Sequence, residues 1–292
     1  MKKYKVEERY IAFMDILGFS KIIENDDNPK RIFEAIEDAI KEQKELKKEY
    51  LDSDLKITWF SDSIVISKSG QDIYNLQFLL SVIISIQRKL LLQGILLRGG
   101  VAKGECYHSE KNVYGKSMIE AYKLESKKAI TPRIIISEDI IKEIDKSIEE
   151  ENKEIEENYN YQMRHADRDY APIISKSYIE SIPVGEEIKN NIIKKDTDNT
   201  YFINYLQESL SVCVCKNNGE IYKKEMYEDF YKEILCKVRD IISCGLKSGE
   251  MHVTLKYIWL KDYYNNTIRY LCNNMNGEYK RDFYTIFSKP IQ

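Results

Sequence analysis

Residues 10–23 read YIAFMDILGFSKII, a short apolar run that contains one acid, Asp15, and turns at Gly18. A short apolar run that ends at a glycine turn is typical of a buried strand, so we expect a strand over Tyr10–Asp15. A carboxylate in such a strand is costly unless it is paired or binds a cation, and this strand contains no basic residue. Asp15 is therefore a candidate metal ligand, and capping of the following helix is the alternative.

A second acid in apolar surroundings is Asp62. Residues 54–70 read DLKITWFSDSIVISKSG, and the β-branched and aromatic residues on both sides of Asp62 predict a hairpin with the acid at its turn. If the tip of this hairpin meets the end of the first strand, the two carboxylates lie close together and a divalent cation relieves their repulsion. Mg²⁺ prefers few protein carboxylates together with substrate phosphates, which matches a site with two acids. The alternative is that Asp62 only forms the turn.

The remaining pattern predicts an α+β protein. Helices are expected over residues 28–50 and about 72–93, and the second is apolar enough to be buried against a sheet. Residues 95–108 predict a strand that is interrupted at Gly99 and Gly100. Further helices are expected at 116–129, 138–157 and 221–274, further strands at 133–137 and 200–212, and a polar loop at about 152–197. This order predicts helices packed on one face of a mainly antiparallel sheet.

The composition argues against several classes of protein. The 292 residues include 45 Lys and Arg against 48 Asp and Glu, so the basic excess typical of nucleic-acid-binding proteins is missing. No apolar run reaches the roughly 18 to 20 residues that span a bilayer, and no signal-peptide cleavage site follows the N-terminal apolar run. The six cysteines form no CxxC pair, which favours a reducing compartment. We expect a cytoplasmic protein with neither nucleic acid nor membrane as a partner.

Four segments carry a family resemblance. FMDILGFS at 13–20, FSDSIVIS at 60–67, LLRGGVAKGECYH at 96–108 and VYGKSMIEAYKLES at 113–126 resemble, in the same order, four motifs of class III nucleotidyl cyclases. The resemblance implies a ferredoxin-like core, an antiparallel sheet with helices, and head-to-tail homodimers with active sites at the subunit interface. It also implies that the 3′-oxygen of a nucleoside triphosphate is closed onto its own α-phosphate with release of pyrophosphate.

The same resemblance implies roles for individual residues. Asp15 and Asp62 hold two Mg²⁺ or Mn²⁺ ions with the help of the Ile16 carbonyl. Phosphate binding falls to Gly18, Phe19 and Ser20. Arg98 has two interpretations that stay open, because it either contacts phosphate or pairs with an acid.

Four positions depart from the family pattern. Lys123 replaces the catalytic arginine and keeps its charge but not its bidentate geometry, while Ile119 replaces an asparagine and cannot donate a hydrogen bond. Thr58 and Asn112 stand where adenylate cyclases have the Lys and Asp that bind adenine, so a different base is expected. This altered set most resembles the pyrimidine cyclases of bacterial anti-phage signalling, the Pycsar systems.

That closer resemblance implies conversion of UTP or CTP into a 3′,5′-cyclic nucleotide that a separate cyclic-nucleotide-binding effector reads. A purine cyclase and a catalytically silent nucleotide-binding regulator are the alternatives, and Ile119 and Lys123 favour the silent regulator. We expect a catalytic domain over residues 1–208, with an insertion at about 150–197, and a helical C-terminal extension over 209–292. His108, one of three histidines in the chain, receives no role.

Overall fold

An inner strand of the sheet is β1 (Glu7–Ile16), which confirms the strand expected at Tyr10–Asp15. The computed structural model describes residues 5–25, 30–46, 54–165, 182–207, 224–274, 286–287 and 290–291 of the chain. β1 pairs antiparallel with β3 (Ser63–Ser69) on one side and with β4 (Leu97–His108) on the other. β2 (Lys56–Phe60) pairs with β3, so these four strands have the order β2-β3-β1-β4.

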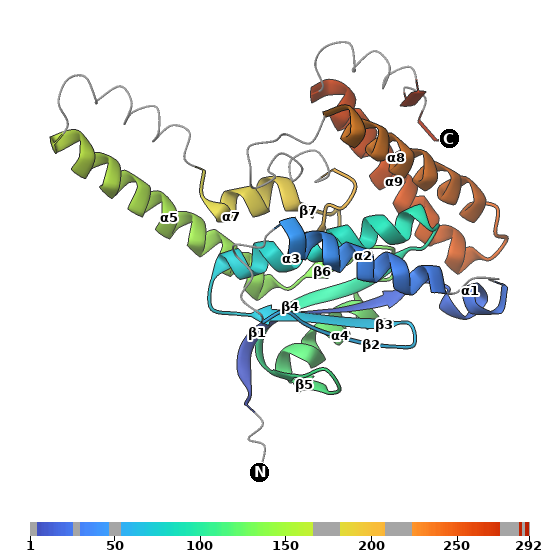
Figure 1. Cartoon of the computed structure of the whole chain (residues 1–292). Helices are drawn as coiled ribbons and strands as arrows, with labels where there is room; N and C mark the ends of the chain where they lie inside the picture. Colours follow the sequence, from blue (N-terminus) through green and yellow to red (C-terminus); the bar gives the residue numbers. More distant parts are fainter. Residues whose placement is uncertain are drawn as a thin grey trace.

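Helices connect these strands in the ferredoxin-like way. The short α1 (Phe19–Asn25) and α2 (Lys30–Leu46) lie between β1 and β2, and α3 (Ile73–Leu92) lies between β3 and β4. The α2 and α3 helices run on the same face of the sheet (Figure 1). A βαββαβ order with this strand arrangement confirms the α+β, ferredoxin-like core expected from the sequence.

The two faces of β1 have different neighbours. Tyr10 and Met14 belong to the large core that α2 and α3 cover, whereas Phe13 packs on the opposite face with Ala121 of α4 (Lys116–Lys127). This alternation follows the two-residue period of a strand. The expectation that helices lie on one face is therefore wrong, because β1 is apolar on both sides and α4 covers part of the second face (Figure 1).

The most apolar helix, α3, lies in the centre of the large core. Within the described part of the chain it is the single helix that is long and apolar enough to cross a membrane, but 78% of its most apolar window is buried. The α3 helix begins where the Asp72 carboxylate accepts a 2.9 Å hydrogen bond from the Asn75 backbone N–H. The prediction of a helix buried against the sheet is confirmed, and packing in the core accounts for its apolar character.

The β4 strand continues through its two adjacent glycines. A Cβ atom at Gly99 would lie 2.6 Å from the Phe13 carbonyl oxygen of β1, and one at Gly100 would lie 2.5 Å from the Ala121 carbonyl of α4. The glycines therefore allow β1 and α4 to approach β4 closely. The expected interruption at this point is wrong, since both residues form part of a regular strand.

Four further strands extend the sheet. They are β5 (Val113–Gly115), β6 (Ile134–Ile136), β7 (Ile193–Lys195) and β8 (Tyr201–Ile203). β6 pairs parallel with β4 and antiparallel with β8, which in turn pairs with β7, while β5 pairs back on β4. The strand expected at 200–212 is therefore short, and residues 208–212 lie outside the described part of the chain.

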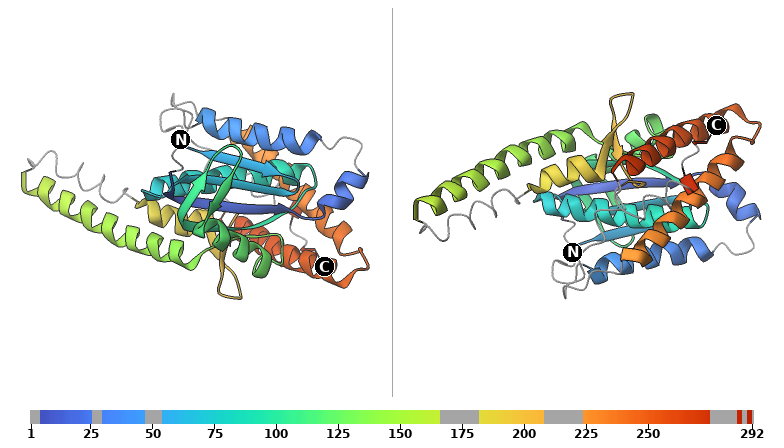
Figure 2. Two further views of the ribbon diagram at one scale, coloured as in Figure 1. Left: turned by 90° about the horizontal axis from the view of Figure 1, so that it is seen from below. Right: turned by 90° about the horizontal axis from the view of Figure 1, so that it is seen from above.

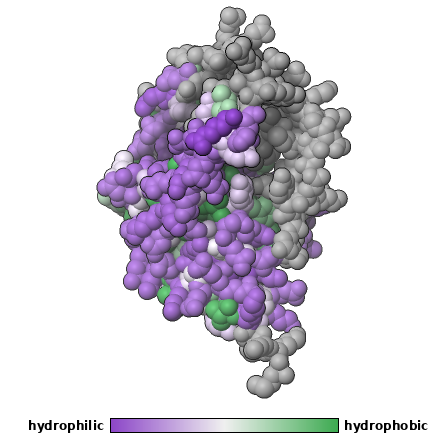
Figure 3. All heavy atoms as spheres, turned by 90° about the vertical axis from the view of Figure 1, so that its left-hand side faces the viewer, coloured by the Kyte–Doolittle hydropathy of each residue, from purple (hydrophilic) through white to green (hydrophobic). Residues whose placement is uncertain are grey.

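The charged helix α5 (Glu138–His165) extends well beyond the expected end at residue 157. Only its first turns contribute to the core, and its later part carries exposed ion pairs such as Lys146–Glu150 and Lys153–Glu157. The later part of this helix buries no side chain, and its mainly charged and polar sequence resembles a polar loop. The side of the molecule from which α5 projects is mainly hydrophilic (Figure 3).

The expected loop at about 152–197 is thus partly regular. Besides the end of α5, it contains α7 (Val184–Glu187) and the following π-helical turn η1 (Ile188–Ile192), which leads into β7. Residues 166–181 of this stretch lie outside the described part of the chain.

Two long helices, α8 (Lys224–Gly245) and α9 (Met251–Asn274), confirm the helices expected after residue 221. They run side by side, and α8 packs on α3 (Figures 1 and 2). Leu235 of α8 and Tyr263 of α9 belong to the same buried cluster as the residues of α3. The C-terminal helices and the sheet therefore share one continuous core.

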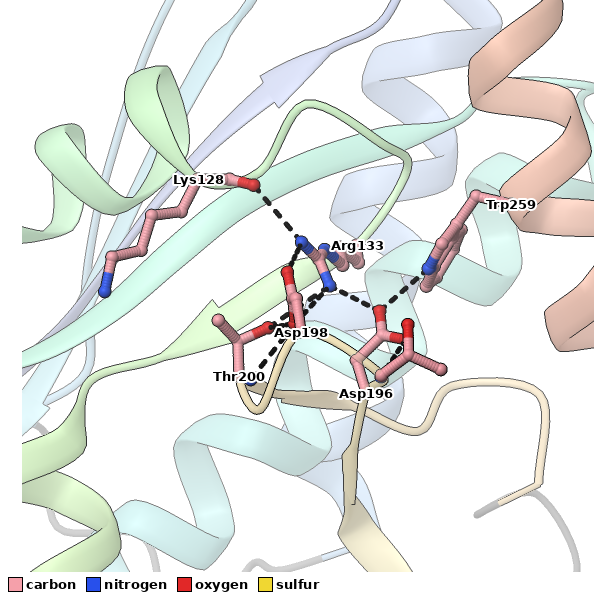
Figure 4. A network of polar contacts seen from close by, with 7 residues as sticks. Lys128, Arg133, Asp196, Asp198, Thr200 and Trp259 are labelled. Atoms are coloured by element: carbon pink, nitrogen blue, oxygen red, sulfur yellow. Dashed lines mark hydrogen bonds and ion pairs between the residues drawn. The ribbon is translucent and has the colours of Figure 1, made fainter.

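Arg133, directly before β6, connects the β7–β8 turn and α9 to the sheet (Figure 4). Its buried guanidinium pairs with Asp196 and with Asp198, whose Oδ2 lies 2.6 Å from Arg133 Nη2. Trp259 of α9 donates a 2.8 Å hydrogen bond from Nε1 to Asp196 Oδ2. One cation thus holds together three segments that are far apart in the sequence.

Replacing Arg133 by methionine tests this connection. Arg133→Met leaves the Asp196 carboxylate, which is 12% exposed, without its counter-charge. We expect the free energy of unfolding to fall by about 3 kcal/mol, measured by urea titration with tryptophan fluorescence. Lys127→Met, at an exposed position of α4, is the control and is expected to change it by less than about 0.5 kcal/mol. Equal stability of the two variants would contradict the role of Arg133.

Candidate active site at the end of β1

The structure brings Asp15 and Asp62 together. Asp15 lies near the end of β1 and is in register with Ser63, the first residue of β3. The two-residue turn between β2 and β3 contains Ser61, with a positive φ of 55°, and Asp62, whose carbonyl accepts a 2.9 Å hydrogen bond from the Ile16 N–H. The tip of the hairpin therefore meets the end of the first strand.

Arg98 is the immediate partner of Asp15. The two residues face each other across β1 and β4, and Arg98 Nε donates a 3.0 Å hydrogen bond to Asp15 Oδ2. Arg98 Nη2 also forms a 2.8 Å ion pair with Glu125 Oε1 of α4. Of the two interpretations of Arg98, the structure shows the ion pairs with acids.

Glu125 is a third acid in this cluster that the sequence analysis missed. Its side chain is 4% exposed, because it lies on the face of α4 that packs against the sheet. The available signal was its position four residues after the apolar Ala121, which places both on one face of a helix. A glutamate at a buried helix position needs a charge partner, and Arg98 supplies it.

The electrostatics of the cluster follow from burial and crowding of like charges. Burial raises the pKa of Asp15, the Arg98 guanidinium lowers it, and the adjacent Asp62 carboxylate raises it again. Burial also raises the pKa of Glu125, and Asp15 and Asp62 add to that effect against the opposing charge of Arg98. Three carboxylates thus share one guanidinium, and the cluster carries an excess of negative charge.

The residues present fit a divalent cation. Asp15 and Asp62 repel each other at short range, and Arg98 engages only one oxygen of Asp15, so carboxylate oxygens remain for a metal ion. Within the described residues, no group of three or more His, Cys, Asp or Glu side chains is placed to hold a metal ion. A cation here would need further oxygen ligands, such as phosphate oxygens or water.

The predicted phosphate-binding residues follow directly after Asp15. Gly18 has a φ of 74°, a left-handed conformation that favours glycine, and it turns the chain from β1 into α1. Gly18 and Ser20 are exposed beside the two acids, whereas the Phe19 side chain packs against the large core. Phe19 can therefore offer a backbone N–H to a ligand but not its ring.

The predicted base-binding residues form a separate group. Thr58 Oγ1 donates a 3.1 Å hydrogen bond to the carbonyl of Ser109, and the Ser109 N–H donates a 2.9 Å hydrogen bond to the Asn112 carbonyl. Thr58 lies on β2, which is two strands away from the β1 strand of Asp15, and it is two residues along β2 from the position opposite Asp15. This offset corresponds to about 12 Å between the backbone atoms of Asp15 and Thr58. The predicted site residues therefore fall into two clusters on the same side of the sheet.

Lys123 belongs to neither cluster within one chain. It is exposed on α4, and the buried residues of that helix are Ser117, Ala121, Leu124 and Glu125. Ile119, four residues earlier, is 56% exposed. The structure therefore places both departures from the family motif on the outer face of α4, away from Asp15 of the same chain.

Replacing Arg98 distinguishes its two interpretations. Arg98→Leu leaves Glu125 buried without a partner, so we expect the free energy of unfolding to fall by about 3 kcal/mol in a urea titration. The double variant Arg98→Leu/Glu125→Gln is the control and should recover part of this loss, because it removes the buried charge. If Arg98→Leu keeps full stability and only weakens nucleotide binding, the phosphate-contact interpretation is correct instead.

The buried His108 makes stability depend on pH. Burial, together with the charges of Arg9 and Lys56, lowers the pKa of His108 to about 4, while an unfolded histidine titrates near the usual pKa of about 6.5. Between these values the unfolded chain binds a proton that the folded chain does not. We therefore expect the free energy of unfolding to decrease, by on the order of 3 kcal/mol, as the pH falls from 6.5 to 4.

The variant His108→Gln tests this assignment, since it removes the titratable group. Urea titrations of both proteins at a series of pH values should show a flatter profile for the variant in this range. Parallel profiles for the two proteins would show that His108 does not contribute to the pH dependence.

Comparisons with known proteins give distant structural likenesses only. No protein-family profile matches the sequence, and no curated protein matches it. The monomeric guanylyl cyclase domain of the RhoGC fusion protein from the aquatic fungus Blastocladiella emersonii is 15% identical over 68% of this chain and 95% of that chain, with a TM-score of 0.38. The non-canonical dimeric form of that domain is 18% identical over 45% of this chain and 80% of that chain, with a TM-score of 0.33. The ferredoxin-like assignment stands on the strand order of the chain itself.

Proposed function

We propose that the chain is a metal-dependent nucleotidyl cyclase that converts a pyrimidine nucleoside triphosphate, UTP or CTP, into a 3′,5′-cyclic nucleotide and pyrophosphate. The observation that carries this proposal is the convergence of Asp15 and Asp62 at the end of β1, where burial and mutual repulsion raise the pKa of Asp15. Two crowded carboxylates beside an exposed glycine turn suit a metal-bound triphosphate.

The reaction needs alignment more than it needs a protein nucleophile. The 3′-oxygen loses its proton to solvent and forms a bond to the α-phosphorus, while the bond between the α-phosphorus and the bridging oxygen breaks and pyrophosphate leaves. Two Mg²⁺ or Mn²⁺ ions, when bound, supply charge stabilisation to the attacking and leaving oxygens. Asp15, Asp62 and the Ile16 carbonyl would hold these ions, and the turn at Gly18, Phe19 and Ser20 would orient the phosphates.

The pyrimidine preference rests on Thr58 and Asn112. Both carry small polar groups at positions where the resemblance places the adenine-binding Lys and Asp. Trp59, beside Thr58, stacks on Phe33 with ring centres 4.1 Å apart, and its indole N–H donates to the Ser61 carbonyl at 2.7 Å. Its ring is therefore occupied by packing, which leaves the small polar groups to select the base.

We infer that the active enzyme is a homodimer with shared sites. The metal-binding and base-binding clusters are about 12 Å apart in one chain, and Lys123 points away from both acids of its own chain. Large exposed apolar side chains occur on the same side of the sheet, on β2, β5 and α4: Phe60, Tyr114, Ile119 and Tyr122. Burying this face against a second copy would complete each site with Thr58, Asn112 and Lys123 of the other protomer.

A second candidate function is a catalytically silent regulator that binds a nucleotide. Two observations favour it: the exposed Ile119 cannot donate a hydrogen bond to a transition state, and Arg98 already engages one oxygen of Asp15. The crowded acids are the reason that we prefer the cyclase. If the cyclase works in anti-phage signalling in the cytoplasm, a separate effector that binds cyclic nucleotides should be encoded beside it.

Product formation tests the proposal directly. The purified chain is incubated with ATP, GTP, CTP and UTP separately, with Mn²⁺, and cyclic products are identified by mass spectrometry. We expect a cyclic product from UTP or CTP. Asp62→Ala should abolish turnover, because it removes one of two carboxylates that hold the metal ions, while thermal unfolding and sedimentation should still show a folded dimer.

Asp139→Ala is the matched control, since Asp139 is an exposed acid at the start of α5. It should retain full turnover. Product from ATP or GTP alone would contradict the pyrimidine preference, and absence of product from all four substrates would favour the silent regulator. Unfolding of Asp62→Ala would show that this acid has a structural role instead.

A further inference from the structure

A buried chain of hydrogen bonds ends at Thr58. Arg9 of β1, Ser67 of β3 and His108 at the end of β4 are all buried. Arg9 Nε donates to Ser67 Oγ at 2.9 Å, and Ser67 Oγ lies 2.7 Å from His108 Nδ1. His108 Nε2 lies 3.0 Å from Thr58 Oγ1, which in turn donates to the Ser109 carbonyl at 3.1 Å.

The contact between Thr58 and the Ser109 carbonyl determines the direction of the hydrogen bonds at His108. A guanidinium can only donate, so Ser67 Oγ accepts from Arg9 and keeps its own hydrogen available for His108 Nδ1. With that hydrogen on Ser67, the neutral imidazole carries its hydrogen on Nε2 and donates it to Thr58 Oγ1. The opposite tautomer would consume the Thr58 hydrogen and leave two acceptors, Thr58 Oγ1 and the Ser109 carbonyl, facing each other at 3.1 Å.

Arg9, at the start of this chain of hydrogen bonds, is itself held in place by Asp54. Its Nη1 donates to Asp54 Oδ1 at 2.9 Å, its Nη2 donates to the Asp54 carbonyl at 2.6 Å, and Asp54 Oδ2 accepts from the Ser69 N–H at 2.8 Å. Burial of the ring and the charge of Arg9 also keep His108 neutral at pH 7, because they lower its pKa to about 4. The tautomer of His108 is therefore fixed by its surroundings.

As a result, the Thr58 hydroxyl can no longer choose between donating and accepting a hydrogen bond to a ligand. Its single hydrogen goes to the Ser109 carbonyl, and one of its two lone pairs accepts from His108. Only the second lone pair remains for a ligand, so Thr58 can accept a hydrogen bond but cannot donate one. Ser109 is also bonded to Asn112, so both candidate base-binding residues belong to one network.

Resting on the cyclase function proposed above, we propose that His108 is a positioning residue that holds Thr58 as a hydrogen-bond acceptor for the nucleotide base. The base group that contacts Thr58 must then be a donor, which is N3–H in uracil and the exocyclic amine in cytosine. His108 does not touch the substrate in this arrangement. His108 selects the base by fixing Thr58 as a hydrogen-bond acceptor.

Two substitutions of His108 separate this role from general packing. A glutamine places its amide nitrogen near the position of Nε2 and can still donate to Thr58, whereas an asparagine reaches only the position of Nδ1 and the contact to Ser67. We expect His108→Asn to raise KM for the pyrimidine substrate about tenfold with kcat within twofold, and His108→Gln to restore KM to within about threefold of the wild type. His252→Asn, at an exposed histidine of α9, is the control.

A base analogue gives an independent readout. N3-methyl-UTP, or N4,N4-dimethyl-CTP if CTP is the substrate, lacks the donor that Thr58 is proposed to bind. The wild type should discriminate against the methylated analogue by at least about tenfold in kcat/KM, and His108→Asn should lose most of this discrimination. Thermal unfolding of all variants checks that a difference in KM does not follow from a loss of folded protein.

The outcomes distinguish this inference from the function on which it rests. Cyclic product from the wild type together with equal KM values for His108→Asn and His108→Gln would overturn the role of His108 and leave the cyclase standing. Absence of product from the wild type with every substrate would overturn the cyclase and this inference with it. A ¹⁵N spectrum of the His108 ring that shows the hydrogen on Nδ1 would also overturn the inference, whatever the activity.

Discussion

The ion pair between Asp15 and Arg98 is the interaction on which the site depends. An acid in an inner strand of the sheet is tolerated because Arg98 faces it across β1 and β4, and the same guanidinium neutralises the buried Glu125 of α4. Gly99 and Gly100, which follow Arg98, bring β1 and α4 close enough for both contacts. One short segment of β4 therefore sets the packing of the core and the electrostatics of the candidate active site.

The excess negative charge of this cluster explains why a cation site fits here. Arg98 compensates one charge of three, and the two acids at the rim, Asp15 and Asp62, keep oxygens that no described residue neutralises. At the base-binding end of the proposed site, the charged residue is buried and acts indirectly. Arg9 does not reach a ligand there, and it is connected to the hydroxyl of Thr58 by hydrogen bonds through Ser67 and His108.

The predictable part of the fold is the part with a simple period. The apolar run around Asp15 predicted β1, and the β-branched and aromatic residues around Asp62 predicted the hairpin. The helical spacing after residue 72 predicted α3. The position of α4 on the second face and the length of α5 were not predictable in this way. A strand that is apolar on both sides does not tell which helix covers which side, and an exposed helix has the composition of a loop.

The site was predictable where acids interrupt apolar runs, but its partners depend on tertiary contacts. Glu125 and His108 gain their surroundings from residues 27 and more positions away along the chain, so no local pattern marks them. The most direct test of the account is Mn²⁺ binding in the presence of a 2′,3′-dideoxy pyrimidine triphosphate, which cannot cyclise, followed by electron paramagnetic resonance. The account predicts two bound ions for each site and loss of at least one in Asp15→Asn. Binding that is absent in the wild type, or unchanged by that substitution, would contradict it.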